Sequence, residues 1–380
     1  MSKRPFEGEQ ERISSDASRF NDMLLKKLQR ALNKDPEANL ADLFPSDYAS
    51  RLAGKKRKGS DELRELNDPS PTATHCHSLP NDDRRAILHV YPLSPSISKL
   101  LQTFGSSSQD TSDSFAQRLD MFLQASESLW VSEACANHRV VRHADLVVKI
   151  VPNIGDYTEY TSMLYLEKHH PEIPAPRPKG LLAIEGTAYI FMSYIPGITL
   201  NRVWKNLCEG QKISIRNQLD QILLKLRDFH HPEGMPLGGV CEEGCKDTRR
   251  HTRYSKAPIF NDAGFDDFIF SNPHFGSPVY IRTLRQLAAR QPSRLSFCHG
   301  DLRPDNIVVQ VGDEGKYQVT GLLDWEKSGL YPEYFECVKA TSTMSTSEMD
   351  DWFIFLPKSA CPSTYPERWL VDRLWDKHVA

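Results

Sequence analysis

The feature that most constrains this sequence is a short loop between two apolar runs. Phe297-Cys298-His299 predicts the end of a buried strand, and Gly300 predicts a sharp loop directly after it. Asp301 is therefore expected on a loop and not within a helix. Pro304 stiffens this loop, and Ile307-Val308-Val309 returns the chain to a strand.

A β-hairpin is expected immediately after the loop. Ile307-Val308-Val309 and the run Tyr317–Leu323 are its strands, and Gly312-Asp313-Glu314-Gly315 is its turn. Such a hairpin places Asn306 and Asp324 at the same end, within reach of one metal ion. A few hard oxygen ligands of this kind suit a Mg²⁺ ion that keeps its waters and binds nucleotide phosphates.

The spacing of Asp301, Asn306 and Asp324 matches a recurring arrangement for phosphoryl transfer. In that arrangement the first Asp accepts the proton of the attacking hydroxyl. The Asn and the second Asp hold Mg²⁺ against the phosphates of ATP. The alternative is a surface hairpin with incidental acidic residues, which the length of the combined pattern disfavours.

The composition sets few limits on function. The 380 residues leave room for two domains, or for one two-lobed unit with additional sequence. A net charge of −3 gives no general attraction to nucleic acid or membrane. No apolar run approaches the roughly 18 residues that a membrane span needs. The N-terminus Met1–Glu7 lacks the apolar core of a secretory signal, so we expect a cytoplasmic protein without a membrane partner.

The eight cysteines are scattered, and only Cys241 and Cys245 are close together. Together with His230, His231 or His251 they are a conceivable zinc site. No second cysteine pair completes such a site. Free thiols in a reducing cytosol are therefore the favoured interpretation.

Residues 1–114 are expected to form a partly disordered N-terminal extension. A helix is predicted from Asp16 to Asn33, and rising apolar density from Ile87 to Phe104 predicts contact with the main domain. Between them lie Pro/Ser-rich stretches and the basic run Lys55–Lys58. That run is either solvated surface or a patch for nuclear import or nucleic acid, the second being less favoured. The extension is also a candidate site for an unknown protein partner.

Residues 115–196 predict a small β-rich lobe. A helix is expected over Ser114–Ser126, followed by strands over Arg139–Arg142 and Leu146–Val151. Lys149 lies in the second strand, where kinases hold an ammonium group near the α- and β-phosphates.

A helix predicted over Tyr157–His169 should carry the carboxylate that pairs with Lys149. Glu159 and Glu167 both lie on it, and Glu159 is favoured because it precedes the inward-facing Met163 by one turn. Such a pair orients the lysine and keeps it charged.

The remaining part of this lobe predicts a hinge. Strands over Gly180–Ile184 and Ala188–Tyr194 lead to a break at Pro196-Gly197. Adenine is expected against the backbone of Met192, Tyr194 and Ile195. Residues 197–380 would then form a larger, mainly helical lobe that holds the catalytic loop and the acceptor site.

Two helices and one long irregular segment are expected in that larger lobe. The helices cover Gln211–His230 and Val279–Arg290. Residues 232–275 between them are too long for a simple connector, and we assign them to acceptor recognition.

Several of these motifs together resemble the aminoglycoside phosphotransferase / choline kinase-like family, especially its fungal-type branch, over about residues 115–345. The resemblance implies an α+β, bilobal protein-kinase-like fold and ATP-dependent transfer of a phosphoryl group to a hydroxyl of a small molecule. It also implies that Asp301 is the base and that Asn306 and Asp324 bind Mg²⁺. The family label does not name the acceptor. The matching motifs are Val147-Val148-Lys149, Ile173-Pro174-Ala175-Pro176, Met192–Gly197, His299-Gly300-Asp301-Leu302, Asn306-Ile307, Asp324-Trp325-Glu326 and Gly329–Tyr334.

The chain departs from protein kinases at two points. His-Gly-Asp replaces His-Arg-Asp, and no Ala-Pro-Glu segment follows Asp324, so a small acceptor is favoured over a protein. An acidic group after Asp324 either attracts a cationic acceptor or is a solvated face. Its members are Glu326, Glu333, Glu336, Asp350 and Asp351.

One further departure bears on activity. The expected phosphate loop Val131–His138 contains no glycine, although glycine lets a loop approach phosphates closely. The alternative to an enzyme is therefore a catalytically silent, kinase-like binding or scaffold protein.

Overall fold

The computed structural model describes residues 16–35, 39, 48, 87–104, 115–132, 138–152, 154–228, 234–249, 252–288, 293–312 and 315–379. The chain divides into two compact units, residues 1–77 and residues 78–380. In the first unit, α1 (Asp16–Lys34) confirms the predicted helix, and the buried Phe20 ring stacks on Tyr48 with centroids 5.9 Å apart. The basic run Lys55–Lys58 lies outside the described residues.

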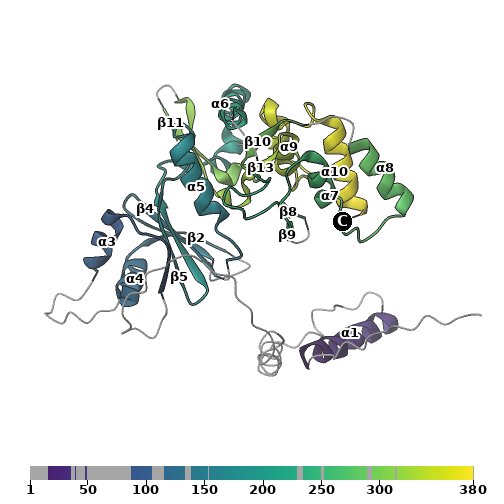
Figure 1. Cartoon of the computed structure of the whole chain (residues 1–380), viewed down its shortest axis with the longest axis horizontal. Coiled ribbons are helices and arrows are strands. Elements are labelled where there is room, and N and C mark those ends of the chain that lie inside the picture. The colour runs from purple at the N-terminus through teal and green to yellow at the C-terminus, as the bar shows by residue number, and fades with distance from the viewer. Residues whose placement is uncertain are drawn as a thin grey trace, which may run out of the picture. The chain divides into compact units, whose positions relative to one another are not determined.

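The second unit contains a six-stranded antiparallel sheet in the order β1-β5-β6-β4-β3-β2 (Figure 1). The strands predicted on either side of His143 and between residues 178 and 194 are confirmed. The members are β1 (Ile87–Tyr91), β2 (Glu127–Val131), β3 (Arg139–His143), β4 (Leu146–Pro152), β5 (Pro178–Ile184) and β6 (Thr187–Ser193).

Part of the expected N-terminal extension belongs to this sheet. β1 pairs with β5, and α3 (Pro95–Gln102) contributes the buried Ile97 and Leu101 to the same apolar cluster as the sheet. The rise in apolar residues from Ile87 onward had indicated such a contact.

Different helices cover the two faces of the sheet, because successive side chains of a strand point to opposite faces. α3 and α4 (Phe115–Gln124) share an apolar cluster with Val148, whereas α5 (Thr158–His169) shares one with Val147. Figure 1 shows α5 on the other side of the sheet from α3 and α4. Lys149, two residues after Val147, therefore points to the α5 face.

The chain then becomes mainly helical, as expected for the larger lobe of the predicted α+β, two-lobed fold. The predicted helices at 211–230 and 279–290 are confirmed as α6 and α8. The helices are α6 (Glu209–Arg227), α7 (Asp262–Ile269), α8 (Pro278–Ala288), α9 (Tyr334–Ala340) and α10 (Pro366–His378). No helix in the described residues is long and apolar enough to span a membrane.

Small sheets in this lobe hold the loop that contains Asp301. β11 (Ile307–Val311) pairs with β12 (Tyr317–Leu322) and confirms the predicted hairpin. On its other side β11 pairs with β7 (Ile198–Thr199), which directly follows the break at Pro196-Gly197. β10 (Leu295–Cys298) pairs with β13 (Gly329–Pro332). The loop that contains Asp301 thus leaves one small sheet and enters another.

The segment 232–275 is more regular than expected. Its described part contains a hairpin of β8 (Lys246–Thr248) and β9 (Thr252–Tyr254), followed by α7. The prediction of an irregular segment was wrong because both strands are only three residues long and mostly polar, so no alternation could identify them.

A buried network of charges surrounds this hairpin, which we call the Asp247 cluster. The fully buried Asp247 carboxylate pairs with Lys339, with Arg249 at 2.9 Å and with Arg253 at 2.5 Å. Arg249 also pairs with Asp372 at 2.6 Å and Asp376 at 3.4 Å on α10. Three cations thus face three carboxylates.

Candidate active site

The backbone at Gly300 explains why this loop contains His-Gly-Asp. Gly300 has φ = +77°, a left-handed conformation that side chains disfavour. A Cβ atom here would also clash with the backbone carbonyl of Lys327. An arginine at this position, as in His-Arg-Asp, would therefore not fit without a shift of the chain.

The Asp301 carboxylate is largely buried and held on one side. Its Oδ2 atom accepts a hydrogen bond from Asn306 Nδ2 at 3.2 Å. The same oxygen lies 3.2 Å from Lys327 Nζ and 3.6 Å from Arg303 Nε. Within the described residues no donor contacts Oδ1. The arrangement fixes the carboxylate through one oxygen and leaves the other available to a hydroxyl group.

Asn306 also fixes the loop backbone. Its Nδ2 donates to the Asp301 carbonyl at 2.9 Å, and its own carbonyl accepts the Leu323 N–H at 2.8 Å. Ile307 pairs with Leu322 in the hairpin. Asn306 and Asp324 therefore lie at the same end of the hairpin, as the sequence predicted.

His299 and Glu336 support the loop from beneath. His299 Nδ1 accepts the Asp301 N–H at 3.2 Å and Nε2 faces the Leu323 carbonyl at 2.9 Å, so the ring fits the neutral form with its proton on Nε2. Glu336 Oε2 accepts the N–H groups of His299 and Gly300 at 2.6 and 3.2 Å. Burial raises the pKa of Glu336, although the N–H groups of Gly300 and His299 oppose the rise.

The expected acidic face after Asp324 is therefore wrong for several of its members. Glu336 is buried under the catalytic loop, Glu333 pairs with Arg227 at 3.2 Å, and Asp351 pairs with Lys212 at 2.6 Å. Glu333 and Asp351 are held in ion pairs and Glu336 accepts backbone N–H groups, which sequence spacing alone did not reveal.

Lys149 lies at the centre of a second group, the Lys149 cluster. Its Nζ is 2.6 Å from Asp324 Oδ1, 2.8 Å from Glu159 Oε2 and 3.3 Å from Glu326 Oε2. Burial alone would lower the pKa of Lys149, but the three carboxylates outweigh it and raise that pKa well above its usual value. The structure thus brings Lys149 and Glu159 together, as the sequence predicted, and adds Glu326.

Asp324 adopts an unusual backbone conformation. Its φ and ψ angles are 65° and 63°, which few residues other than glycine adopt, although Asp tolerates them. Burial opposes ionisation, but Lys149 dominates and lowers the pKa of Asp324. A strained, ionised carboxylate at this position is typical of a functional residue.

The Lys149 cluster has the composition of a cation site. Ligand oxygens of Glu159, Asp324 and Glu326 lie within 4.8 Å of one another. When all three carboxylates are ionised, the group including Lys149 has an excess of two negative charges, which matches the charge of one Mg²⁺ ion. Carboxylate oxygens are the ligands that Mg²⁺ prefers.

The predicted hinge follows β6, the strand that pairs with β4 and thus with the strand of Lys149. Tyr194 N–H donates to the Asp145 carbonyl at 2.8 Å, and Arg142 covers the Tyr194 ring with its guanidinium 3.7 Å from the centroid. Met192 is within β6, between β4 and β5. The Ile195 side chain occupies the space where Gly321 lacks a Cβ atom, so the hinge contacts the hairpin of the catalytic loop.

Two predicted features cannot be placed fully. Residues 133–137 of the expected phosphate loop lie outside the described residues, as do His230, His231 and His251 of the conceivable zinc site. Cys241 is an exposed free thiol and Cys245 a buried one.

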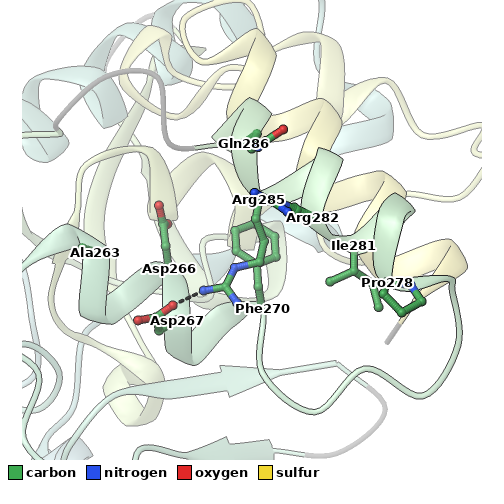
Figure 2. Close-up of a pocket in the computed structure, with 9 residues that line it drawn as sticks. All are labelled: Ala263, Asp266, Asp267, Phe270, Pro278, Ile281, Arg282, Arg285 and Gln286. Atoms are coloured by element: carbon green, nitrogen blue, oxygen red, sulfur yellow. Dashed lines mark hydrogen bonds and ion pairs between the residues drawn. The ribbon is translucent and has the colours of Figure 1, made fainter.

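A hollow of about 600 Å³ lies between α7 and α8, far along the sequence from the Lys149 cluster. Figure 2 shows Arg285 and Asp267 joined by an ion pair at this hollow. None of the candidate catalytic, nucleotide or metal residues lines it. Four residues that line it, Ala263, Asp266, Asp267 and Phe270, belong to the segment 232–275 that the sequence assigned to acceptor recognition.

The fold and the site together define a kinase-like phosphotransferase class. The family model described as "Phosphotransferase enzyme family" matches residues 117–354, which is more than half of the chain. The chain belongs to this family. The match assigns the family and not a branch within it.

The chain is also similar to individual proteins. An aminoglycoside 3'-phosphotransferase of Streptomyces fradiae is 22% identical over 217 residues, 55% of this chain and 74% of that protein. An aminoglycoside-3'-phosphotransferase of type VIII is 17% identical with a TM-score of 0.43, covering 66% of this chain and 93% of that one. A putative fructosamine-3-kinase from Haemophilus somnus is 14% identical with a TM-score of 0.41, covering 66% and 81%.

Proposed function

We propose that this chain transfers the γ-phosphoryl group of ATP to a hydroxyl group of a small molecule. The observation that carries the proposal is the one-sided environment of Asp301, with its neighbours on Oδ2 and no described donor on Oδ1. A carboxylate held in this way suits a general base that accepts the proton of the attacking hydroxyl. Asp301 is the catalytic residue in this proposal.

The nucleotide would lie between the hinge and the Lys149 cluster. Lys149, oriented by Glu159, would face the α- and β-phosphates. Adenine would lie against the hinge at Met192, Tyr194 and Ile195. Because the Tyr194 N–H already bonds to Asp145, the remaining polar backbone groups of the hinge would bind the base.

Asp324 and Asn306 would hold Mg²⁺. The surplus of carboxylates around Lys149 fits this assignment, and Glu326 is a further oxygen ligand within reach. When bound, the ion neutralises charge on the β- and γ-phosphates. Arg303 and Lys327, beside Asp301 Oδ2, would place positive charge near the transferred group.

The test compares two aspartates of one loop. Asp301→Asn should lower turnover of Mg-ATP by about 10²–10⁴-fold, because it removes the general base. Asp305→Asn is the matched control, since Asp305 is exposed and bonds only to Asn201 among the contacts described. ATP consumption is measured with Mg²⁺ across a panel of hydroxyl compounds.

The same measurements distinguish the enzyme from the alternative, a catalytically silent binding protein. If the wild-type chain binds Mg-ATP but consumes none with any compound, the proposal is wrong and the silent binding protein is supported. If Asp301→Asn and Asp305→Asn turn over ATP equally, Asp301 is not the base.

A further inference from the structure

A second buried lysine lies next to the Lys149 cluster. Lys246, the first residue of β8, has a relative exposure of 7%. Its backbone N–H donates to Tyr331 Oη at 3.1 Å. The chain just before it is fixed to β13 by two bonds between Gly238 and Leu330, at 2.8 and 2.7 Å. The position of Lys246 is therefore set by the fold of the larger lobe.

The ammonium group of Lys246 joins two elements of the site. Nζ lies 2.7 Å from Asp156 Oδ1 and donates to the backbone carbonyl of Glu326 at 2.8 Å. Glu326 belongs to the 3₁₀ turn Trp325–Lys327 that directly follows Asp324. One contact thus lies before α5, and the other lies in the turn that carries the cation ligands.

The contact with Asp156 reaches Glu159 through the start of α5. Asp156 Oδ1 accepts both the Lys246 ammonium and the N–H of Thr158, the first residue of α5. A carboxylate here satisfies a free N–H group of the first turn and interacts favourably with the helix dipole. Glu159 is the next residue and pairs with Lys149.

A second contact links the same two elements. Ser328 Oγ donates to Ser162 Oγ at 2.8 Å, and both side chains are buried. This bond lies one turn further along α5 and one residue beyond the 3₁₀ turn. It is neutral, so Lys246 supplies a charged link at the start of α5, in addition to the one that Lys149 makes from Glu159 to Glu326.

We propose that Lys246 is a positioning residue for the nucleotide site. It holds the start of α5, and with it Glu159, at a fixed distance from Asp324 and Glu326. The Lys149–Glu159 pair is thereby assembled without the phosphorylated activation segment that protein kinases use. This inference rests on the proposed function, because it assigns Mg-nucleotide binding to the Lys149 cluster.

The chain offers a closely matched control in Lys212 on α6. Lys212 has a relative exposure of 8%, pairs with Asp351 at 2.6 Å and lies 5.0 Å from the centre of the Trp204 ring. Lys246 pairs at 2.7 Å and lies 5.9 Å from the Tyr254 ring. Lys246→Met and Lys212→Met remove the same group from similar surroundings, but only the first touches α5 and the 3₁₀ turn.

Calorimetry measures the affinity of each variant for Mg-ATP, and hydrogen exchange measures the opening of α5 without nucleotide. Loss of a residue that orients metal ligands typically weakens binding about 10–100-fold, which we expect for Lys246→Met. Lys212→Met should bind like the wild type, and α5 should exchange faster only in Lys246→Met. If Lys246→Met does not fold, Asp156→Ala should show the same two changes.

Equal affinities and equal α5 exchange in the two lysine variants would overturn the inference while leaving the proposed function intact. A wild-type chain that does not bind Mg-ATP at all would overturn both. Loss of affinity in Lys246→Met but not in Lys212→Met supports the positioning role.

Discussion

The Lys149 cluster and the Asp247 cluster differ in their ratio of carboxylates to cations. In the first, three carboxylates surround one cation. In the second, Asp247 lies among three cations, and the carboxylates of Asp372 and Asp376 complete the balance. A balanced network needs no ligand, whereas one with surplus carboxylates is suited to bind a divalent cation.

The two clusters also differ in where their carboxylates come from. The Asp247 cluster joins β8, β9, α9 and α10, all within the larger lobe. The Lys149 cluster joins β4 and α5 of the sheet lobe to the turn after β12. Charge in the first cluster therefore stabilises one lobe, and charge in the second lies where the two lobes meet.

The largest expected effect is on folding stability and comes from a change in the Asp247 cluster. Asp247→Asn leaves three cations without their central carboxylate, and breaking a buried pair of this kind costs about 3–5 kcal/mol of unfolding free energy. Urea unfolding followed by circular dichroism measures the loss. A loss of only about 0.5 kcal/mol, as at an ordinary surface position, would show that the cations do not depend on Asp247.

The second prediction concerns Asp324, where we expect mainly a loss of ligand binding and not a loss of folding stability. Asp324→Asn still leaves Lys149 paired with Glu159 and Glu326, so the nucleotide-free protein should lose much less stability than Asp247→Asn does. The variant should instead lose the stabilisation by Mg-ATP, which for a wild type at 100 times its Kd is about 2.7 kcal/mol. Thermal unfolding with and without Mg-ATP measures both.

Removal of the metal by EDTA should affect the two proteins differently. In the wild type it should abolish most of the stabilisation by ATP, and in Asp324→Asn it should change little. If EDTA leaves the nucleotide effect in the wild type unaltered, the surplus charge does not serve a divalent cation.

The third effect is a pH dependence of Glu159. Burial, and then the nearby Asp324 and Glu326, raise the pKa of Glu159 to about 7 against the opposing pull of Lys149. Because this pKa is raised in the folded state, its contribution to stability is full below about pH 4.5 and is lost as the pH rises through 7. The pKa of Asp247 shifts in the opposite direction, because Lys339 and Arg249 outweigh its burial and lower it. The contribution of Asp247 to stability is therefore lost in acid.

In Glu159→Gln, the change in the unfolding free energy of the nucleotide-free protein between pH 4.5 and 7 should therefore be smaller by on the order of 2 kcal/mol. Urea unfolding at several pH values measures the slope for both proteins. Parallel slopes in the variant and the wild type would mean that Glu159 is ionised throughout this range.

Much of the fold followed from periodicity. Regular strands such as β4 and β6, and the long helix α6, bury a continuous apolar face, so their sequences show it. β1 and β2 were missed because β1 is only partly buried and β2 is exposed along its whole length, so neither shows a strict alternation. The hairpin of β8 and β9 was missed because its buried residues are charged and pair with α9 and α10, far away in the sequence.

The candidate site was predictable where its residues follow a fixed spacing. Asp301, Asn306 and Asp324 lie in one motif, and Lys149 and Glu159 lie on neighbouring predicted elements. Glu326 could have been found, since it lies two residues after Asp324. The roles of Lys246, Lys327 and Glu336 depend on contacts between separate segments, which no spacing in one sequence reveals.

The smallest expected effect tests whether burial, and not the mere presence of an ion pair, separates the Asp247 cluster from the surface. Arg285 and Asp267 form a pair beside the hollow of Figure 2, with side-chain exposures of 43% and 69%. Asp267→Asn should cost only about 0.2–1 kcal/mol, because water solvates both groups in either state. Urea unfolding at low and high salt measures it, and the small loss should vanish at high salt. A loss as large as that of Asp247→Asn would mean that pairing alone governs stability here. A small one leaves burial as the property that makes the Asp247 cluster stabilising.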